Sequence, residues 1–280
     1  MSARKTVRSA AKERSDAKSR DVEEMLLRRA WRVLDANPRD GLIFPKRVKR
    51  DAERLFYELM KKYSFRLFLR NAVSFEDGFE LDKLLQYSTR ECVEGYAEAL
   101  LEAGIVERAG RSKFAFVVPP IRGFGPSLEW FVATMFEREF GCPALWGVKL
   151  ADTKSGGDCD VIAEVENRFA YVEVKSSPPK HVTVNEVTAF LNRVEELRPN
   201  LALFLEDTEL RMKDKIVVLF EEALKNRFGK DVPADLARKR MERELFKVGD
   251  SIYIVNSKPE LVLNVMACLK DSLSGKGLAC

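Results

Sequence analysis

Two short apolar stretches, separated by a few polar residues, constrain the fold of this chain more than any other feature. Residues 159–165 read CDVIAEV and residues 169–175 read FAYVEVK, with Glu-Asn-Arg between them. Runs this short, rich in Val, Ile, Tyr and Phe, are typical of strands, and the link predicts a tight turn at Asn167-Arg168. The second run ends in Glu-Val-Lys, although charged residues are rare on buried strands unless a partner compensates them. We therefore expect an antiparallel hairpin with a compensated cluster of charges at its open end.

The spacing of the charged residues predicts which of them meet. Side chains alternate between the two faces of a strand, so Glu173 and Lys175 share one face. Asp160 lies seven residues before Asn167, and Lys175 lies seven residues after Arg168. If the two strands pair around this turn, two carboxylates and one amine converge at one end of the sheet.

Such a cluster has a limited chemistry. Two close carboxylates repel each other unless one is protonated or a cation lies between them. Oxygen ligands suit Mg²⁺ or Mn²⁺, and a site of several histidines is excluded because His181 is the only histidine. A neighbouring lysine can orient or deprotonate a water, or stabilise charge on a phosphoryl oxygen. The combination favours metal-assisted phosphodiester hydrolysis; the alternative is an ordinary acid-x-Lys pair on a solvent-facing strand.

These residues also carry a resemblance to a known family. Asp160, the strand VIAEV and Glu173-Val174-Lys175 on the next strand resemble the PD-(D/E)xK nuclease superfamily, in particular its restriction-endonuclease-like and Holliday-junction-resolvase-like members. The segment GGDCDVIAE is similar to the Gly-Asp-x-x-Asp segment of Mrr-type restriction enzymes. The resemblance covers about residues 126–207. It departs from the family pattern at Cys159, where a proline often stands.

The resemblance implies a role for each matched residue. Asp160 would be the central metal ligand, Glu173 the second and the Val174 carbonyl a third, with Lys175 as the catalytic lysine. Many members add a glutamate from the helix before the first strand, and Glu129 occupies the first turn of that helix, which Ser127 is expected to cap. The implied cofactor is Mg²⁺ or Mn²⁺, and the implied substrate is DNA. Homodimers are common among such enzymes, so a homodimer is a further expectation.

Several residues are candidates for contact with nucleic acid. The predicted contacts around the hairpin end come from two lysines and one hydroxyl, Lys154, Ser176 and Lys180. Each of them is equally compatible with an ordinary surface position.

The N-terminal half predicts a different architecture. A helix is expected to begin at Asp21 and to stop at Asn37-Pro38. Beyond it, a short helix, a longer helix over 88–103 and a hairpin over 105–117 follow the order of a winged helix-turn-helix. The longer helix is acidic, which disfavours it in a DNA groove and favours a protein partner. The hairpin instead offers three basic residues for phosphate contact, Arg108, Arg111 and Lys113.

The sequence of the remaining region predicts alternating strands and helices. Expected strands cover 144–151, 159–166, 169–176, 201–207 and 251–257, and expected helices cover 128–141, 184–197, 215–229, 235–246 and 259–273. The segment 215–229 is also compatible with a strand at its start. The predicted fold is therefore α/β: a restriction-endonuclease-like mixed sheet flanked by helices, preceded by a mostly helical, winged-helix-like domain. The expected division is a basic flexible tail over 1–20, the helical domain over 21–118, a linker over 119–125 and the nuclease-like domain over 126–280.

Charge and cysteine content set the expected location. The formal net charge is +4, and residues 1–20 hold seven Lys/Arg against two Asp/Glu, so the basic excess is a property of the tail. The five cysteines are scattered, without a Cys-x-x-Cys pair, which favours a reducing compartment. No apolar run is long enough to span a membrane. We expect a cytoplasmic protein that does not contact membranes.

Three functions remain open at this point. The first is a metal-dependent endonuclease acting on DNA. The second is a non-catalytic winged-helix DNA-binding or regulatory protein that uses the nuclease-like fold as a scaffold. The third is a nuclease subunit that depends on a protein partner bound through the acidic helix 88–103.

Overall fold

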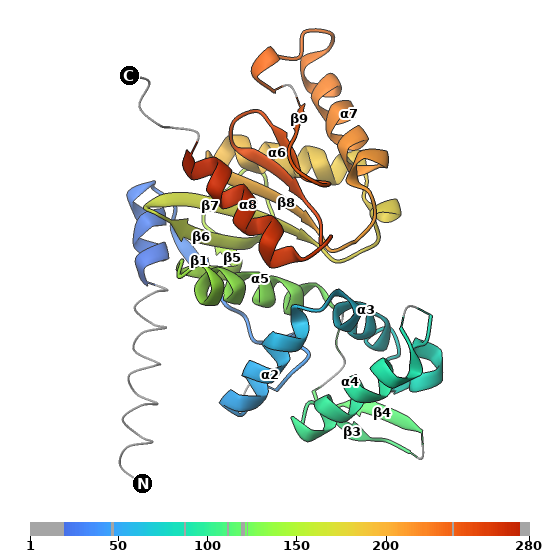
Figure 1. Ribbon diagram of the computed structural model, residues 1–280. Helices are drawn as coiled ribbons and strands as arrows, with labels where there is room; N and C mark the ends of the chain where they lie inside the picture. Colours follow the sequence, from blue (N-terminus) through green and yellow to red (C-terminus); the bar gives the residue numbers. More distant parts are fainter. Residues whose placement is uncertain are drawn as a thin grey trace.

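The computed structural model of the chain contains two β-sheets surrounded by helices (Figure 1). It describes residues 20–45, 48–86, 88–110, 112–118, 121, 123–236 and 238–274. The larger sheet has eight strands in the order β1-β5-β6-β7-β8-β11-β10-β9, and the smaller has three in the order β2-β4-β3. In this part of the chain, no helix is long and apolar enough to cross a membrane.

The larger sheet is mixed. Its central strands β7, β8 and β11 run parallel, and the outer strands pair antiparallel. The strands are β1 (Val33–Asp35), β5 (Ala144–Leu150), β6 (Cys159–Val165), β7 (Arg168–Lys175), β8 (Leu201–Glu206), β9 (Arg238–Arg240), β10 (Phe246–Val248) and β11 (Ile252–Val255). This architecture confirms the predicted α/β class with a mixed sheet between helices.

Helices cover both faces of this sheet because its central strands are apolar on both sides. Side chains such as Val172 and Val174 pack with α5 (Gly125–Glu139) and α8 (Leu261–Ser274). On the other face, Phe169 and Tyr171 pack with α6 (Val184–Leu197) and α7 (Ile216–Phe228). The charged end of β7 therefore emerges from between two packed layers.

The smaller sheet belongs to the helical region. Its elements are α2 (Arg50–Met60), α3 (Tyr63–Ala72), β2 (Phe79–Glu80), the 3₁₀ helix η1 (Leu81–Leu84), α4 (Arg90–Glu102), β3 (Val106–Arg108) and β4 (Lys113–Phe116). The last four follow the predicted order of short helix, longer helix and hairpin, and β2 was not predicted. This region shares one continuous core with α5, where Phe44 and Phe56 contact Trp130. The two parts of the molecule are therefore packed directly on each other.

The helix predicted from Asp21 to Asn37 forms only in its first half. Residues 20–28 are helical, but Val33–Asp35 forms β1, which pairs with β5 at the edge of the large sheet. The side chain of Asn37 accepts a hydrogen bond from the backbone of Trp146, 3.0 Å away, and holds the chain there. An open sheet edge has unpaired backbone groups, and here pairing with them outweighs local helix propensity.

This pairing bears on the expected domain boundary. The 21–118 assignment places residues 21–35 in the helical region, whereas they pack on the large sheet. The remaining division stays a prediction, and the tail residues 1–19 and linker residues 119, 120 and 122 lie outside the described residues.

A second expected helix, over 235–246, is wrong. The segment instead contains β9 and most of the connection to β10, which form an antiparallel hairpin. Two hydrogen bonds from the Arg240 guanidinium to the Arg243 carbonyl stabilise the turn, while Phe246 and Val248 are buried against β11. Burial of these two apolar residues in the sheet explains the strand.

Candidate active site

The hairpin of β6 and β7 sets the geometry of the charged cluster. Its turn lies at Glu166 and Asn167, which both adopt positive φ (50° and 59°), one residue earlier than predicted. The register pairs Val161 with Val172, so Asp160 comes opposite Glu173 rather than Lys175. Because this differs from the predicted pairing by two residues, the same side chains remain on the same face.

Asp160 lies at the start of β6 and bonds to the next strand. Its Oδ2 accepts a hydrogen bond from the backbone N–H of Val174 at 2.7 Å. Burial and the neighbouring carboxylates of Glu173 and Glu129 raise the pKa of Asp160 well above its usual value. Asp160 is therefore a carboxyl group held in place amid like charge.

Glu173 is buried and almost completely compensated. Its Oε1 lies 3.0 Å from Lys175 Nζ, and its Oε2 lies 3.1 Å from a guanidinium nitrogen of Arg193 on α6. The hydroxyl of Tyr171 also donates to Oε2. These partners explain how a buried strand tolerates the sequence Glu-Val-Lys.

Lys175 bridges two carboxylates. Besides Glu173, its Nζ lies 3.3 Å from Oε1 of Glu186, in the first turn of α6. Burial lowers the pKa of Lys175, but the charge and hydrogen bond of Glu173, with Glu186, outweigh this and raise it. Lys175 is therefore a protonated ammonium at neutral pH, which suits stabilisation of negative charge better than removal of a proton.

Glu129 reaches the cluster from α5. A Cβ built on Gly147 would lie 3.8 Å from its Oε2, so its carboxyl group lies over β5. Burial, then the charges of Glu173 and Asp158, raise the pKa of Glu129 to about 7. The expectation that Ser127 caps this helix is wrong: α5 begins at Gly125, and the Ser127 hydroxyl accepts a hydrogen bond from Ile43 instead.

The donor atoms fit a hard divalent cation in type and charge. Asp160 and Glu129 offer carboxylate oxygens. Burial, followed by the negative charge of Glu173, raises the pKa of both groups, and a cation between them would offset both effects. The positions are not yet those of a formed site, because among the described residues no group of three or more His, Cys, Asp and Glu is arranged to hold a metal. Glu173 would first have to release one of its present partners.

Besides Glu186, two further residues of the cluster were not predicted. Arg193 lies two helical turns after Glu186 on α6, and besides Glu173 it binds the carbonyl of Gly156 at 2.7 Å. Glu186 and Arg193 are seven residues apart and therefore lie on the same face of the helix, and this spacing could have predicted that Arg193 joins the cluster. Glu206 ends β8 directly beside Lys175, is 0% exposed, and both its oxygens lack a hydrogen-bond partner. Burial and the adjacent Asp207 raise its pKa to about 9.

The predicted nucleic-acid contacts divide into two groups. Ser176 follows Lys175, and its carbonyl accepts a hydrogen bond from Arg70 of α3 at 3.0 Å. Lys154 and Lys180 are exposed on the loops around the same end of the hairpin. Two of the other predicted contacts lie in the small sheet: Lys113 begins β4, and Arg108 ends β3 with Glu98 of α4 2.7 Å away. Arg111 lies outside the described residues.

Comparisons with known proteins find similarity in structure and none in family. No family model matches the chain, and no curated protein matches it. Solved structures that are similar to it include the following two. Can2 from Sulfobacillus thermosulfidooxidans, in complex with cyclic tetra-adenylate, shares 16% identity at a TM-score of 0.48, over 89% of this chain and 61% of that one. VC1899 from Vibrio cholerae shares 16% identity at a TM-score of 0.46, over 72% of this chain and 55% of that one. The chain thus spans less than two thirds of either.

Proposed function

We propose that this protein is a metal-dependent endonuclease that hydrolyses phosphodiester bonds in DNA. The observation that supports this most is the convergence of Asp160, Glu173 and Lys175 at the end of the β6–β7 hairpin, with Glu129 approaching from α5. The resemblance to PD-(D/E)xK nucleases rests on the same residues. The cofactor is Mg²⁺ or Mn²⁺.

The residues have distinct roles in this proposal. Asp160, Glu173 and the Val174 carbonyl would hold the metal, with Glu129 as a further acid, and the metal would supply an activated water and charge neutralisation. The Lys175 ammonium stabilises negative charge that develops on a phosphoryl oxygen. Glu186 keeps Lys175 in place when Glu173 turns to the metal, since it already lies within ion-pair distance.

Substrate contacts are assigned to the surface around this end. Lys154, Ser176 and Lys180 bind phosphates beside the cluster. Arg111 and Lys113 provide a weaker contact from the hairpin, whereas Arg108 contributes little because Glu98 already neutralises it.

A second candidate function is a nuclease subunit that requires a protein partner. Residues Glu91, Glu94, Glu98 and Glu102 of α4 are at least partly exposed, which favours a basic partner over DNA at this helix. A homodimer is a further possible assembly. A non-catalytic DNA-binding role is the remaining alternative, and it requires that the cluster at β7 be inert.

Cleavage of labelled duplex, single-stranded, flap and four-way-junction DNA tests the proposal. Reactions contain Mg²⁺, Mn²⁺ or EDTA, with wild type, Asp160→Ala and the exposed control Glu91→Gln run side by side. We expect metal-dependent cutting that Asp160→Ala lowers about 10³-fold and Glu91→Gln leaves unchanged. Binding without cutting on any substrate would favour the partner-dependent or scaffold functions. Equal cutting by wild type and Asp160→Ala would overturn the assignment of the site.

A further inference from the structure

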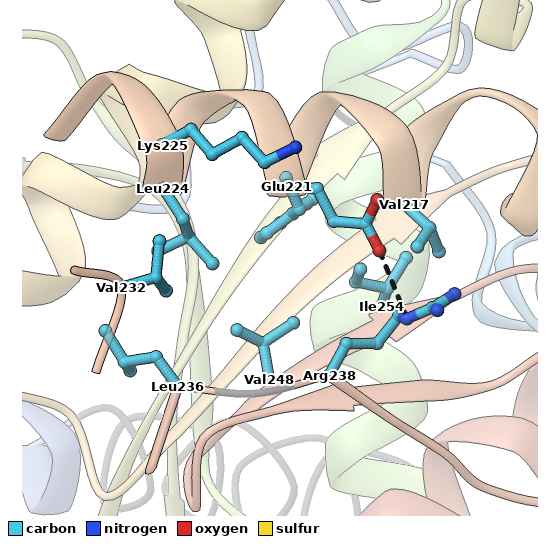
Figure 2. Close-up of a pocket in the computed structure, with 10 residues that line it drawn as sticks. Val217, Glu221, Leu224, Lys225, Val232, Leu236, Arg238, Val248 and Ile254 are labelled. Atoms are coloured by element: carbon cyan, nitrogen blue, oxygen red, sulfur yellow. Dashed lines mark ion pairs between the residues drawn. The ribbon is translucent and has the colours of Figure 1, made fainter. Parts of the chain in front are cut away.

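A cavity of about 300 Å³ lies between α7 and the strands β10 and β11, on the second face of the large sheet. Figure 2 shows its walls: Val217 and Leu224 project from α7, Val248 and Ile254 from the strands, and Val232 and Leu236 from the connection between α7 and β9. None of the residues assigned to the β7 cluster lines it. It is therefore a separate feature of the molecule.

The cavity is partly open to solvent. A water occupies about 30 Å³ in the liquid, so the cavity has room for several waters. Most of its lining is aliphatic or aromatic, so these waters find few polar partners on its walls. Poorly held waters are displaced favourably by an apolar group, and the lining therefore favours an apolar guest.

The rim adds a charge preference. Arg238 of β9 forms an ion pair with Glu221 of α7 at 3.3 Å (Figure 2). Lys225, one turn further along α7, has no ion-pair partner among the residues that the structure describes. Two cations and one acid leave the rim with an excess of one positive charge. An anionic group is therefore favoured at the mouth.

We propose that this cavity is a binding site for a small amphipathic carboxylate, whose apolar body lies among Leu224, Val248 and Ile254 and whose carboxylate pairs with Lys225. The volume is at the lower end of the range for ligand pockets, about 300–1,000 Å³, which limits the guest to a short alkyl chain or a single ring system. The site does not depend on the proposed nuclease activity.

Three probes with the same apolar body test the charge preference. Octanoate, 1-octanol and protonated octylamine are titrated into the full-length protein, with binding followed by methyl NMR. We expect saturable binding of octanoate with Kd between about 10 μM and 1 mM. Octanoate should bind about two- to fivefold tighter than octanol, as expected for a partly exposed ion pair, and octylamine should bind weakest.

Variants locate the binding. Lys225→Gln should remove the preference for octanoate over octanol. Val248→Phe fills the cavity and should weaken all three probes at least tenfold. Leu236→Phe fills the cavity from the connection between α7 and β9 instead of from the sheet. It replaces Val248→Phe in the experiment if that variant fails to fold. Val218→Phe, on the exposed face of α7, is the matched control and should leave binding unchanged.

Three outcomes would overturn the proposal. They are no saturable binding of octanoate, equal binding of the three probes, and binding of octanoate that both cavity-filling variants leave unchanged. Equal binding that the filling variants abolish would indicate instead an apolar side chain of a partner protein as the guest.

Discussion

Two glutamate–arginine ion pairs in this molecule have similar distances but differ in solvent exposure. Glu98 and Arg108 in the helical region lie 2.7 Å apart, and their side chains are 53% and 51% exposed. Glu173 and Arg193 beside the sheet lie 3.1 Å apart, and their side chains are 10% and 12% exposed. Although the Glu98–Arg108 pair is the shorter, it contributes only about 0–1 kcal/mol to stability, because it is exposed to solvent. The burial of a pair, and not its distance, therefore determines how much stability is lost when one partner is removed.

The buried pair belongs to a set of groups that could not remain there singly. A buried charge without a partner is strongly unfavourable, so Glu173, Lys175, Arg193 and Tyr171 must be kept together. Apolar side chains of the same volume would stabilise the sheet as well or better. The presence of these groups is therefore better explained by chemistry than by stability, whereas the acids of α4 form a solvated surface.

Removal of one arginine from each pair should show the largest difference between them. Arg193→Met leaves Glu173 and the Tyr171 hydroxyl with fewer partners and should lower the free energy of unfolding by about 3–5 kcal/mol. Arg108→Met should lower it by less than about 1 kcal/mol. Urea denaturation of both variants measures the difference. Equal losses would mean that burial does not distinguish the two pairs.

Lysines of the two regions should differ in their effect on cleavage. Lys175→Met should lower kcat about 10²–10³-fold, because charge on the phosphoryl oxygen loses its partner. Lys113→Met, in the small sheet, should raise KM and leave kcat unchanged, since a phosphate contact serves binding alone. Single-turnover and steady-state rates separate the two effects. A large change of kcat in Lys113→Met would place the chemistry elsewhere.

Glu206 should make stability depend on pH. Its pKa is about 9 in the folded protein, against an ordinary value of 4.5 for a glutamate carboxyl group, so the native state retains a proton that the unfolded state loses. Stability therefore falls as the pH rises from about 4.5 to 9, by about 3 kcal/mol at pH 7. Glu206→Leu should restore most of the lost stability at pH 7 and should change the stability very little at pH 4.5.

Thermal unfolding of wild type and Glu206→Leu across this pH range measures the effect. The matched substitution Glu98→Gln, at an exposed acid of α4, should leave the pH profile unchanged. A profile that Glu206→Leu does not alter would mean that Glu206 is ionised and has a partner.

The hairpin and its charged end could be predicted because their signals are local. Short apolar runs, a two-residue turn and strict alternation place Asp160, Glu173 and Lys175 on one face, even though the turn lies one residue earlier than expected. The α6 and α7 helices likewise follow from their own periodicity.

The remaining features depend on contacts distant in sequence. Residues 33–35 form a strand only because β5 presents an open edge, and residues 238–240 do so because β10 is held by β11. Arg193 and Glu206 join the cluster through the packing of α6 and the parallel register of β8. The sequence pattern of one segment does not show where another element packs. Tertiary contacts therefore determine these two strands and the positions of Arg193 and Glu206.

Metal binding tests the central claim most directly, because it separates the two acidic regions without any assumption about substrate. Mn²⁺ is titrated into wild type, Asp160→Asn and Glu98→Gln, and free Mn²⁺ is measured by electron paramagnetic resonance. We predict one tight site in wild type and in Glu98→Gln, weakened at least tenfold in Asp160→Asn. Retention of that site in Asp160→Asn, or its loss in Glu98→Gln, would contradict the assignment of the β6–β7 carboxylates as the metal centre.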